Sequence, residues 1–119
     1  MENNPQALRQ RTKEFAVRII KLFKALPPGN KAAQIIGTQL LRSGTAVGAN
    51  YRAAGRARSR AEFVAKLGIV VEEADEAVYW IELLRETDAM KNDRLENLLT
   101  EAHELAAIFT AARESARRR

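Results

Sequence analysis

Apolar residues recur at alternating spacings of four and three along most of the chain, which is the pattern of amphipathic helices in a bundle. The first repeat runs from Leu8 to Leu26 and ends at the turn residues 27–29, Pro-Pro-Gly. Asn30 can cap a second helix, and no proline interrupts the chain from Lys31 onward. We therefore expect the second helix to continue to about Arg58.

Two further helices are predicted in the second half of the chain. Residues 59–62, Ser-Arg-Ala-Glu, form a capping box directly before an apolar repeat from Phe63 to Leu84. Residues 87–93 break the pattern, and Asn92 or Asp93 can cap a fourth repeat, Leu95 to Ala112.

The predicted fold class is therefore all-α, an up-down antiparallel four-helix bundle with a long second and third helix. A chain of 119 residues can bury a sufficient core as one domain. We expect a single domain over 1–119, with residues 1–7 and 114–119 as flexible ends.

The predicted second helix carries a stripe of glycines. At about 100° per residue, four of the six glycines fall within about 40° of one another, namely Gly37, Gly44, Gly48 and Gly55. Each glycine costs roughly 1 kcal/mol relative to alanine inside a helix, so we expect the stripe to serve the close approach of another helix. The G-x-x-x-G element within it resembles a membrane dimer motif, but nearby arginines favour packing outside a membrane.

The predicted third helix carries apolar residues outside the seam that faces the bundle core. Ile69, Trp80 and Leu83 lie to the side of that seam, flanked by Glu73 and Glu76. An isolated bundle would leave Trp80 partly exposed, so this surface indicates contact between subunits. The two carboxylates require arginine partners, from the second helix or from a neighbouring subunit. The predicted oligomer interface comprises Gly37, Gly44, Gly48, Tyr51, Gly55, Ile69, Glu73, Glu76, Trp80 and Leu83.

The net charge of +5 conceals an asymmetry between the two halves. Residues 1–60 hold 12 Lys/Arg and 2 acids, or +10, whereas residues 61–119 hold 8 and 13, or −5. The halves can attract each other within a bundle or between subunits, or the basic half can face an anionic partner such as nucleic acid. The candidate nucleic-acid-binding residues are Arg11, Arg18, Lys21, Arg52, Arg56, Arg58 and Arg60. Few aromatic residues accompany them, which argues against base stacking.

Composition narrows the classes of protein further. The absence of cysteine excludes disulfides and thiolate metal sites. The first ten residues lack the features of a signal peptide, and no run of 18 apolar residues occurs. We expect a cytoplasmic protein with no membrane partner.

The candidate chemistry is sparse. A di-iron site requires two E-x-x-H units, and the single histidine, His103, has no glutamate three residues before it, so we expect it on the surface. No G-x-x-x-x-G-K-[ST] phosphate loop occurs, and Glu73 and Glu76 have no positioned base beside them. We expect no enzymatic activity, no cofactor and no metal ion.

The run LLRSGTAVGANYRAA, then Ser59 and EFVAKLGIVVEEADEAVYWIELL, resembles four-helix-bundle proteins encoded in intervening sequences of bacterial 23S rRNA genes. The resemblance covers about Phe15 to Leu105. In one respect the chain departs from it, because the family often has an acid shortly after the asparagine, where Arg52-Ala53-Ala54 stands here. The most distinctive positions are Ser43, Asn50, Ser59, Glu62-Phe63, Lys66-Leu67, Glu73-Ala74, Glu76 and Tyr79-Trp80-Ile81.

The resemblance implies an up-down bundle that assembles into a ring-like homopentamer. It also implies similarity to the accessory protein of diversity-generating retroelements, a basic pentameric barrel that binds nucleic acid and the reverse transcriptase. We expect a non-enzymatic oligomer whose first two helices bind the phosphates of RNA or DNA without reading sequence. The alternative is a protein-interaction scaffold with no nucleic-acid role, in which the charge asymmetry serves assembly.

Overall fold

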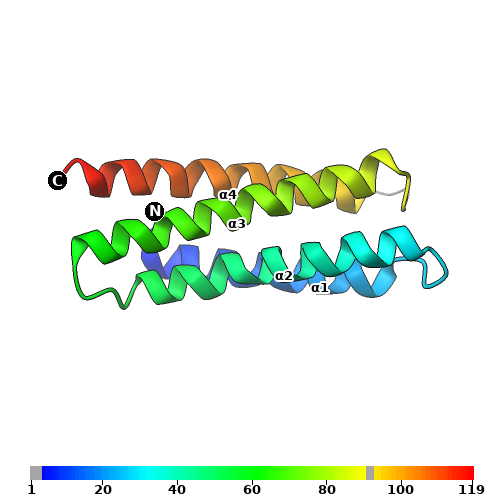
Figure 1. The fold of residues 1–119 in the computed structure, drawn as a ribbon, viewed down its shortest axis with the longest axis horizontal. Helices are drawn as coiled ribbons and strands as arrows, with labels where there is room; N and C mark the ends of the chain where they lie inside the picture. Colours follow the sequence, from blue (N-terminus) through cyan, green and yellow to red (C-terminus); the bar gives the residue numbers. More distant parts are fainter. Residues whose placement is uncertain (1–3, 91–92) are drawn as a thin grey trace.

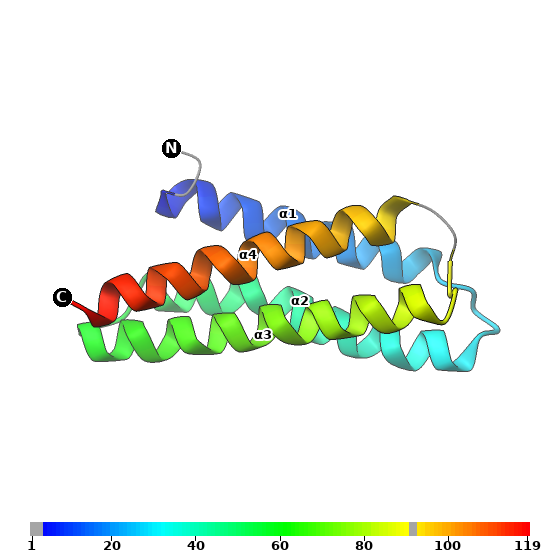
Figure 2. The ribbon, with the colours of Figure 1, turned by 90° about the horizontal axis from the view of Figure 1, so that it is seen from above.

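The computed structural model describes residues 4–90 and 93–119, and this part of the chain forms four helices. Successive helices run in opposite directions and pack side by side, and α4 returns beside α1 (Figures 1 and 2). The predicted all-α class and antiparallel four-helix bundle are thereby confirmed. The molecule measures 49 × 25 × 19 Å. The helices are α1 (Pro5–Ala25), α2 (Lys31–Ala54), α3 (Arg60–Glu86) and α4 (Asp93–Arg117).

The first three helices begin at side-chain caps. Asn4 accepts a hydrogen bond from the N–H of Ala7 at 2.8 Å, and Asn30 accepts one from Ala33 at 3.0 Å. Ser59 accepts a hydrogen bond from the N–H of Glu62 at 3.0 Å, which confirms one half of the predicted capping box; Glu62 accepts in return from the N–H of Arg58, the residue before the cap, at 2.9 Å. Such caps satisfy backbone donors that the first helical turn leaves unpaired, each worth about 1 kcal/mol.

The second helix ends at Ala54, four residues before the predicted end at Arg58. After Gly55 the backbone changes to tighter hydrogen bonds, from Arg56 N–H to Ala53 and from Ala57 N–H to Ala54. The chain must then become extended at Ser59, because a residue that caps the next helix is not itself helical. The cap of α3 therefore limits how far α2 can extend, and the absence of proline from this segment gave no sign of that limit.

Helical structure extends into both predicted flexible ends. The first helix begins at Pro5, where proline suits the first helical position, and α4 continues to Arg117. The predicted cap Asn92 lies outside the described residues. No helix in the described part of the chain combines the length and the apolar character that crossing a membrane requires.

The core contains the apolar residues of the predicted seams. Its largest fully buried side chains include Phe15 and Ile19 on α1, Leu40 on α2, Leu67 on α3 and Phe109 on α4. Two hydroxyl residues are also fully buried, Thr12 and Ser43. Their hydroxyl groups donate to carbonyls of their own helices, Thr12 to Leu8 at 2.9 Å and Ser43 to Leu40 at 3.4 Å. Burial therefore leaves neither donor unsatisfied.

The glycine stripe of α2 packs against α1 of the same chain. A Cβ added to Gly37 would lie 2.5 Å from Leu26, one at Gly44 would overlap the terminal carbon of Ile19, and one at Gly48 would lie 3.2 Å from Thr12. The predicted close approach of another helix is confirmed, and that helix is α1. The stripe therefore has a role within one subunit and gives no argument for an oligomer. Gly55 is exposed at the C-terminal cap of α2, outside this contact.

Candidate nucleic-acid interface

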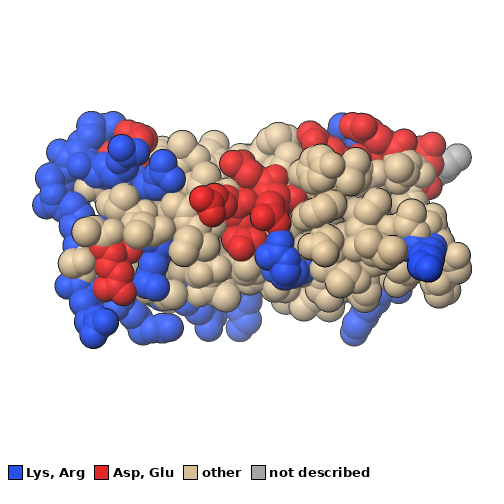
Figure 3. Space-filling model, viewed as in Figure 1, with Lys and Arg blue, Asp and Glu red and all other residues tan. Residues whose placement is uncertain are grey.

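The antiparallel arrangement gathers positive charge at one end of the bundle. The start of α1, the end of α2, the start of α3 and the end of α4 meet there, and Figure 3 shows Lys and Arg concentrated at the end that carries the C-terminus. This concentration at one end is separate from the asymmetry between the halves of the sequence, because the end of α4, in the acidic half, also contributes arginines to it. We call this region of the bundle the basic end. Its cations are Arg9, Lys13, Arg52, Arg56, Arg58, Arg60, Arg113, Arg117, Arg118 and Arg119.

The carboxylates in the same segments already have partners. Glu62 accepts the backbone N–H of Arg58 at 2.9 Å, and Glu114 pairs with Arg117 at 3.1 Å. These contacts are local, between residues at most four positions apart. They leave most of the positive charge of the basic end without a counter-charge.

A shallow groove between α1 and α2 lies within the basic end. Arg9 and Lys13, one turn apart on α1, line it opposite Arg52 in the last turn of α2 and Arg56, two residues beyond the end of that helix. Its volume is about 470 Å³, and Gly48 contributes to its floor, where a side chain would make it shallower. We call this hollow the α1–α2 groove.

The four cations of the α1–α2 groove are exposed, and none of them forms an ion pair with another described residue. No carboxylate appears among the described residues that line the groove. Side chains on one helix at i and i+4 are about 6 Å apart, so Arg9 and Lys13 present a short row of positive charge on α1, opposite the two arginines. An extended anion with several charges fits this arrangement.

Sequence reasoning placed Arg52 and Arg56 in the candidate interface but missed Arg9 and Lys13. The available signal was the matching spacing of four in the two pairs, since α1 and α2 are antiparallel neighbours. The candidates Arg58 and Arg60 do not line the groove; they lie in the connection from α2 to α3 and at the first residue of α3, and both are exposed.

Arg11 differs from the other predicted phosphate-binding residues. Its guanidinium donates to both carboxylate oxygens of Glu101, at 2.7 and 2.8 Å, and to Glu104 at 2.5 Å. The hydrogen bonding of the Arg11 guanidinium to Glu101 is the main cause of a raised pKa for Arg11, and burial partly opposes it. Two carboxylates of α4 therefore neutralise Arg11, and we leave it out of the candidate interface.

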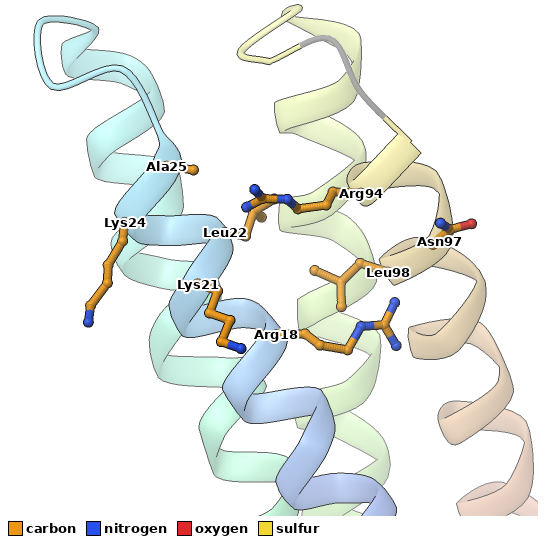
Figure 4. A pocket seen from close by; sticks show the side chains of 8 residues that line it. All are labelled: Arg18, Lys21, Leu22, Lys24, Ala25, Arg94, Asn97 and Leu98. Carbon is orange, nitrogen blue, oxygen red and sulfur yellow. The ribbon is translucent and has the colours of Figure 1, made fainter.

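Arg18 and Lys21 lie apart from the α1–α2 groove. They line the opposite side of α1, facing α4, nearer the other end of the bundle (Figure 4). The structure therefore divides the predicted basic set into two groups on different sides of α1. His103 is exposed on α4, as expected.

Tyr51, a predicted interface residue, belongs to the core. Its side chain is 8% exposed, and its ring packs on Phe109 of α4 with centroids 4.9 Å apart. Burial raises the pKa of Tyr51, and the positive charge of Arg9 partly opposes that shift. Tyr51 therefore connects α2 with α4 within the subunit.

The remaining predicted interface residues lie where α2 and α3 meet at the surface. Arg42 of α2 pairs with Glu73 at 3.4 Å and with Glu76 of α3. The arginine partner expected from the second helix is therefore present, and Figure 3 shows this acidic cluster near the middle of the molecule. His, Asp or Glu groups that could hold a metal ion are not found among residues 4–90 and 93–119.

Apolar side chains flank that ion cluster. Ile69 is 40% exposed, and Trp80 and Leu83 are half-buried. The ring of Tyr79 packs edge-on against that of Trp80, with centroids 4.9 Å apart. The indole N–H of Trp80 is buried and has no hydrogen-bond partner among the described residues. We call this surface the α2–α3 face; it comprises Ile35, Arg42, Ile69, Glu73, Glu76, Tyr79, Trp80 and Leu83.

Comparisons with known proteins identify the family of the chain. A crystal structure at 1.70 Å of a protein of unknown function from the S23 ribosomal protein family of Bacteroides thetaiotaomicron VPI-5482 has the same fold, with a TM-score of 0.82. The two sequences are 35% identical, and the match covers 92% of this chain and 97% of the other. No curated protein matches the chain significantly. The family model of the 23S rRNA-intervening sequence protein matches residues 6–111. The chain therefore belongs to the 23S rRNA-intervening sequence protein family.

Proposed function

We propose that this protein is a non-enzymatic oligomer that binds the phosphate backbone of RNA or DNA through the α1–α2 groove and the flanking basic end. The observation that carries the proposal is the set of four uncompensated cations, Arg9, Lys13, Arg52 and Arg56, around one groove without a carboxylate. A surface of this kind attracts polyanions and releases their counterions on binding.

The groove favours contact with phosphates over contact with bases. Its described lining offers guanidinium and ammonium groups beside threonine and small side chains, and no aromatic ring on which a base could stack. Arg52 stands in the segment where the resemblance leads one to expect an acid. An acid close to the groove would weaken phosphate binding, so this departure supports the proposal for this chain.

Fluorescence anisotropy with a labelled single-stranded RNA of about twenty nucleotides tests the proposal. We expect affinity to fall steeply between about 50 and 200 mM salt, and the variant Arg52→Gln/Arg56→Gln to lower the salt slope by about two. The matched control is Lys31→Gln, compared with the single variant Arg56→Gln; each removes one charge, and Lys31 lies at the start of α2, near the opposite end of the bundle and outside both grooves. Equal losses in the two variants would show attraction by net charge alone and overturn the assignment to the groove.

A single-stranded DNA of the same length extends the same experiment. Comparable affinity for RNA and DNA is expected if the groove contacts phosphates alone, because phosphate contacts carry no sequence information. Binding that does not change with salt would contradict the proposal, since the groove offers mainly charged contacts.

The α2–α3 face supports the oligomeric part of the proposal. Exposed Ile35, Ile69 and Tyr79, beside the half-buried Trp80, give this side an apolar character that a monomer does not require. We propose that this face joins copies of the chain, with the ring-like homopentamer implied by the resemblance as the expected assembly. Light scattering coupled to size exclusion tests this, and a monomer at every concentration would refute it.

The α2–α3 face also favours the second candidate, a protein-interaction scaffold with no nucleic-acid role. In that case another protein covers Trp80 and its neighbours. Affinity capture with and without nuclease distinguishes the two functions. A stable stoichiometric partner retained after nuclease, lost in Trp80→Ala, and no binding to RNA would favour the scaffold.

A further inference from the structure

A larger groove opens between α1 and α4, near the end of the bundle where α1 ends and α4 begins (Figure 4). Its volume is about 670 Å³, within the range of small-molecule sites. Of the neighbouring helix pairs, α1 and α4 are the least closely packed, so a gap at this position follows from the fold. We call it the α1–α4 groove.

Apolar surface dominates the inside of this groove. Leu22 and Leu98 lie at its bottom, almost fully buried, and Figure 4 shows Leu98 pointing from α4 toward α1. Ala25 contributes to the lining at the last residue of α1. The methylene stems of the basic side chains add further apolar wall, because long cationic residues cover apolar surface while their charged ends stay in water.

The rim of the α1–α4 groove is positively charged. Arg18, Lys21 and Lys24 line it from α1, and Arg94 lines it from α4. Figure 4 shows Arg18 reaching toward α4 and Arg94 reaching toward α1, so guanidinium groups of opposite helices approach the groove from both sides. No carboxylate occurs among the described lining residues, and the three α1 cations form no ion pair within the described chain.

We propose that the α1–α4 groove binds a small amphiphilic anion, with a phosphate or carboxylate head between the two guanidinium groups and an alkyl chain along the groove. Charge complementarity selects the head, since planar guanidinium groups bind such oxyanions with two parallel hydrogen bonds. The apolar walls select the chain. The site uses no residue of the α1–α2 groove, so the two proposals stand independently.

The length of the groove argues for a small ligand. Its α1 lining spans Arg18 to Ala25, about two turns or 10 Å along the helix axis. A short alkyl chain fits that length. A partner helix would need a longer apolar strip than the two leucines at the bottom supply.

Isothermal titration calorimetry with octyl phosphate on the full-length protein tests this inference. Inorganic phosphate, octanol and octyltrimethylammonium serve as probes of the head alone, the tail alone and the opposite charge. We expect octyl phosphate to bind roughly tenfold more tightly than each of them, because only it satisfies both the cations and the apolar wall. Octanoate in place of octyl phosphate shows which head the site prefers.

Two variants locate the binding. Arg18→Gln removes one guanidinium, and Ala25→Glu places a carboxylate on an exposed lining position, so each should lower octyl phosphate affinity roughly tenfold. Lys31→Gln is the matched control, because Lys31 is exposed at the start of α2 and does not line the groove. Circular dichroism checks that all three variants remain helical.

Three results would overturn the inference. Inorganic phosphate binding as tightly as octyl phosphate would make the site a plain anion site. Unchanged affinity in Arg18→Gln and Ala25→Glu would place the ligand elsewhere. Arg18-dependent sedimentation with phosphatidylglycerol vesicles, without binding of monomeric octyl phosphate, would assign the surface to a membrane instead of a soluble ligand.

Discussion

The two sides of α1 meet their neighbours in opposite ways. Toward α2, glycines remove the side chains between the helices, and Ile19 and Thr12 pack directly onto the α2 backbone. Toward α4, the helices approach less closely, and ion pairs from Arg11 to Glu101 and Glu104 connect them. One contact depends on close packing, and the other depends partly on charge.

The difference determines how the cations of α1 are used. Where α1 and α2 are close, the space between the two helices has no room for Arg9 and Lys13. These side chains lie at the surface instead, beside Arg52 and Arg56. Where the helices separate, Arg18 lies over a gap, and Arg11 is neutralised by carboxylates. Sequence reasoning placed Arg11 and Arg18 in one candidate surface and left out Arg9 and Lys13, whereas the packing gives these four cations three different environments.

Breaking the close contact should have the largest effect. Gly44→Val places a branched side chain where even a Cβ overlaps Ile19, which is fully buried and has little room to move. We expect the free energy of unfolding to fall by about 2–3 kcal/mol, as overpacked cores typically show. Urea unfolding followed by circular dichroism measures the loss.

The matched control is Gly29→Ala, because no atom lies within 4 Å of the added Cβ and the backbone there is compatible with alanine. Its stability should be unchanged or slightly higher. The variant Ile19→Val removes the overlapping carbon, so Gly44→Val should cost less in that background. Equal costs in both backgrounds would show that the steric contact with Ile19 is not the cause.

Sequence periodicity predicted most of the fold for a physical reason. Spacings of four and three define which side of each helix is buried, and the capping residues Asn30 and Ser59 define where α2 and α3 begin. The glycine stripe showed that a helix approaches α2, but a stripe carries no information on which helix that is. Sequence reasoning therefore counted the glycines as part of an interface between subunits, whereas the partner of Gly37, Gly44 and Gly48 is α1 of the same chain.

The candidate site was less predictable, because it depends on pairs of residues far apart in the sequence. Arg11 and Glu101 are 90 positions apart, and only the return of α4 beside α1 brings them together. The register of α1 on α2 likewise places Arg9 and Lys13 opposite Arg52 and Arg56. The pairing of Arg42 with Glu73 and Glu76 was predictable, since two carboxylates on a partly apolar side require a cation.

Removing the ion pairs on the α4 side should have the second largest effect. Arg11→Met keeps much of the side-chain volume but leaves Glu101, which is 15% exposed, without its partner. We expect a loss of about 1–2 kcal/mol at low salt, because a hydrogen-bonded charge pair that is partly buried contributes more than an exposed one. Thermal unfolding measures it, with Lys31→Met as the control of equal charge. A change no larger than that of the control would show that packing alone holds α4 to α1.

Removing the uncompensated cations should have a smaller effect, of the opposite sign. In Arg52→Gln/Arg56→Gln, repulsion around the α1–α2 groove decreases, so stability at low salt should rise by about 0.5 kcal/mol. The gain should disappear near 1 M salt, where the Debye length is about 3 Å. Unfolding curves at both salt concentrations measure it. A destabilised double variant would mean that these arginines make structural contacts.

The smallest expected effect is on the ionisation of Tyr51. Burial raises its pKa and Arg9 partly opposes the rise, so Arg9→Gln should move the pKa of Tyr51 higher still. Because the folded pKa exceeds the unfolded value of about 10, Tyr51 contributes its full stabilisation below that pH. That stabilisation is lost as the pH rises through the folded pKa, and Tyr51→Phe should flatten this decline. Titration of tyrosinate absorbance, with Tyr51→Phe to assign the signal, measures the shift. An unchanged titration in Arg9→Gln would place the Arg9 charge too far from α2 to share a phosphate with Arg52.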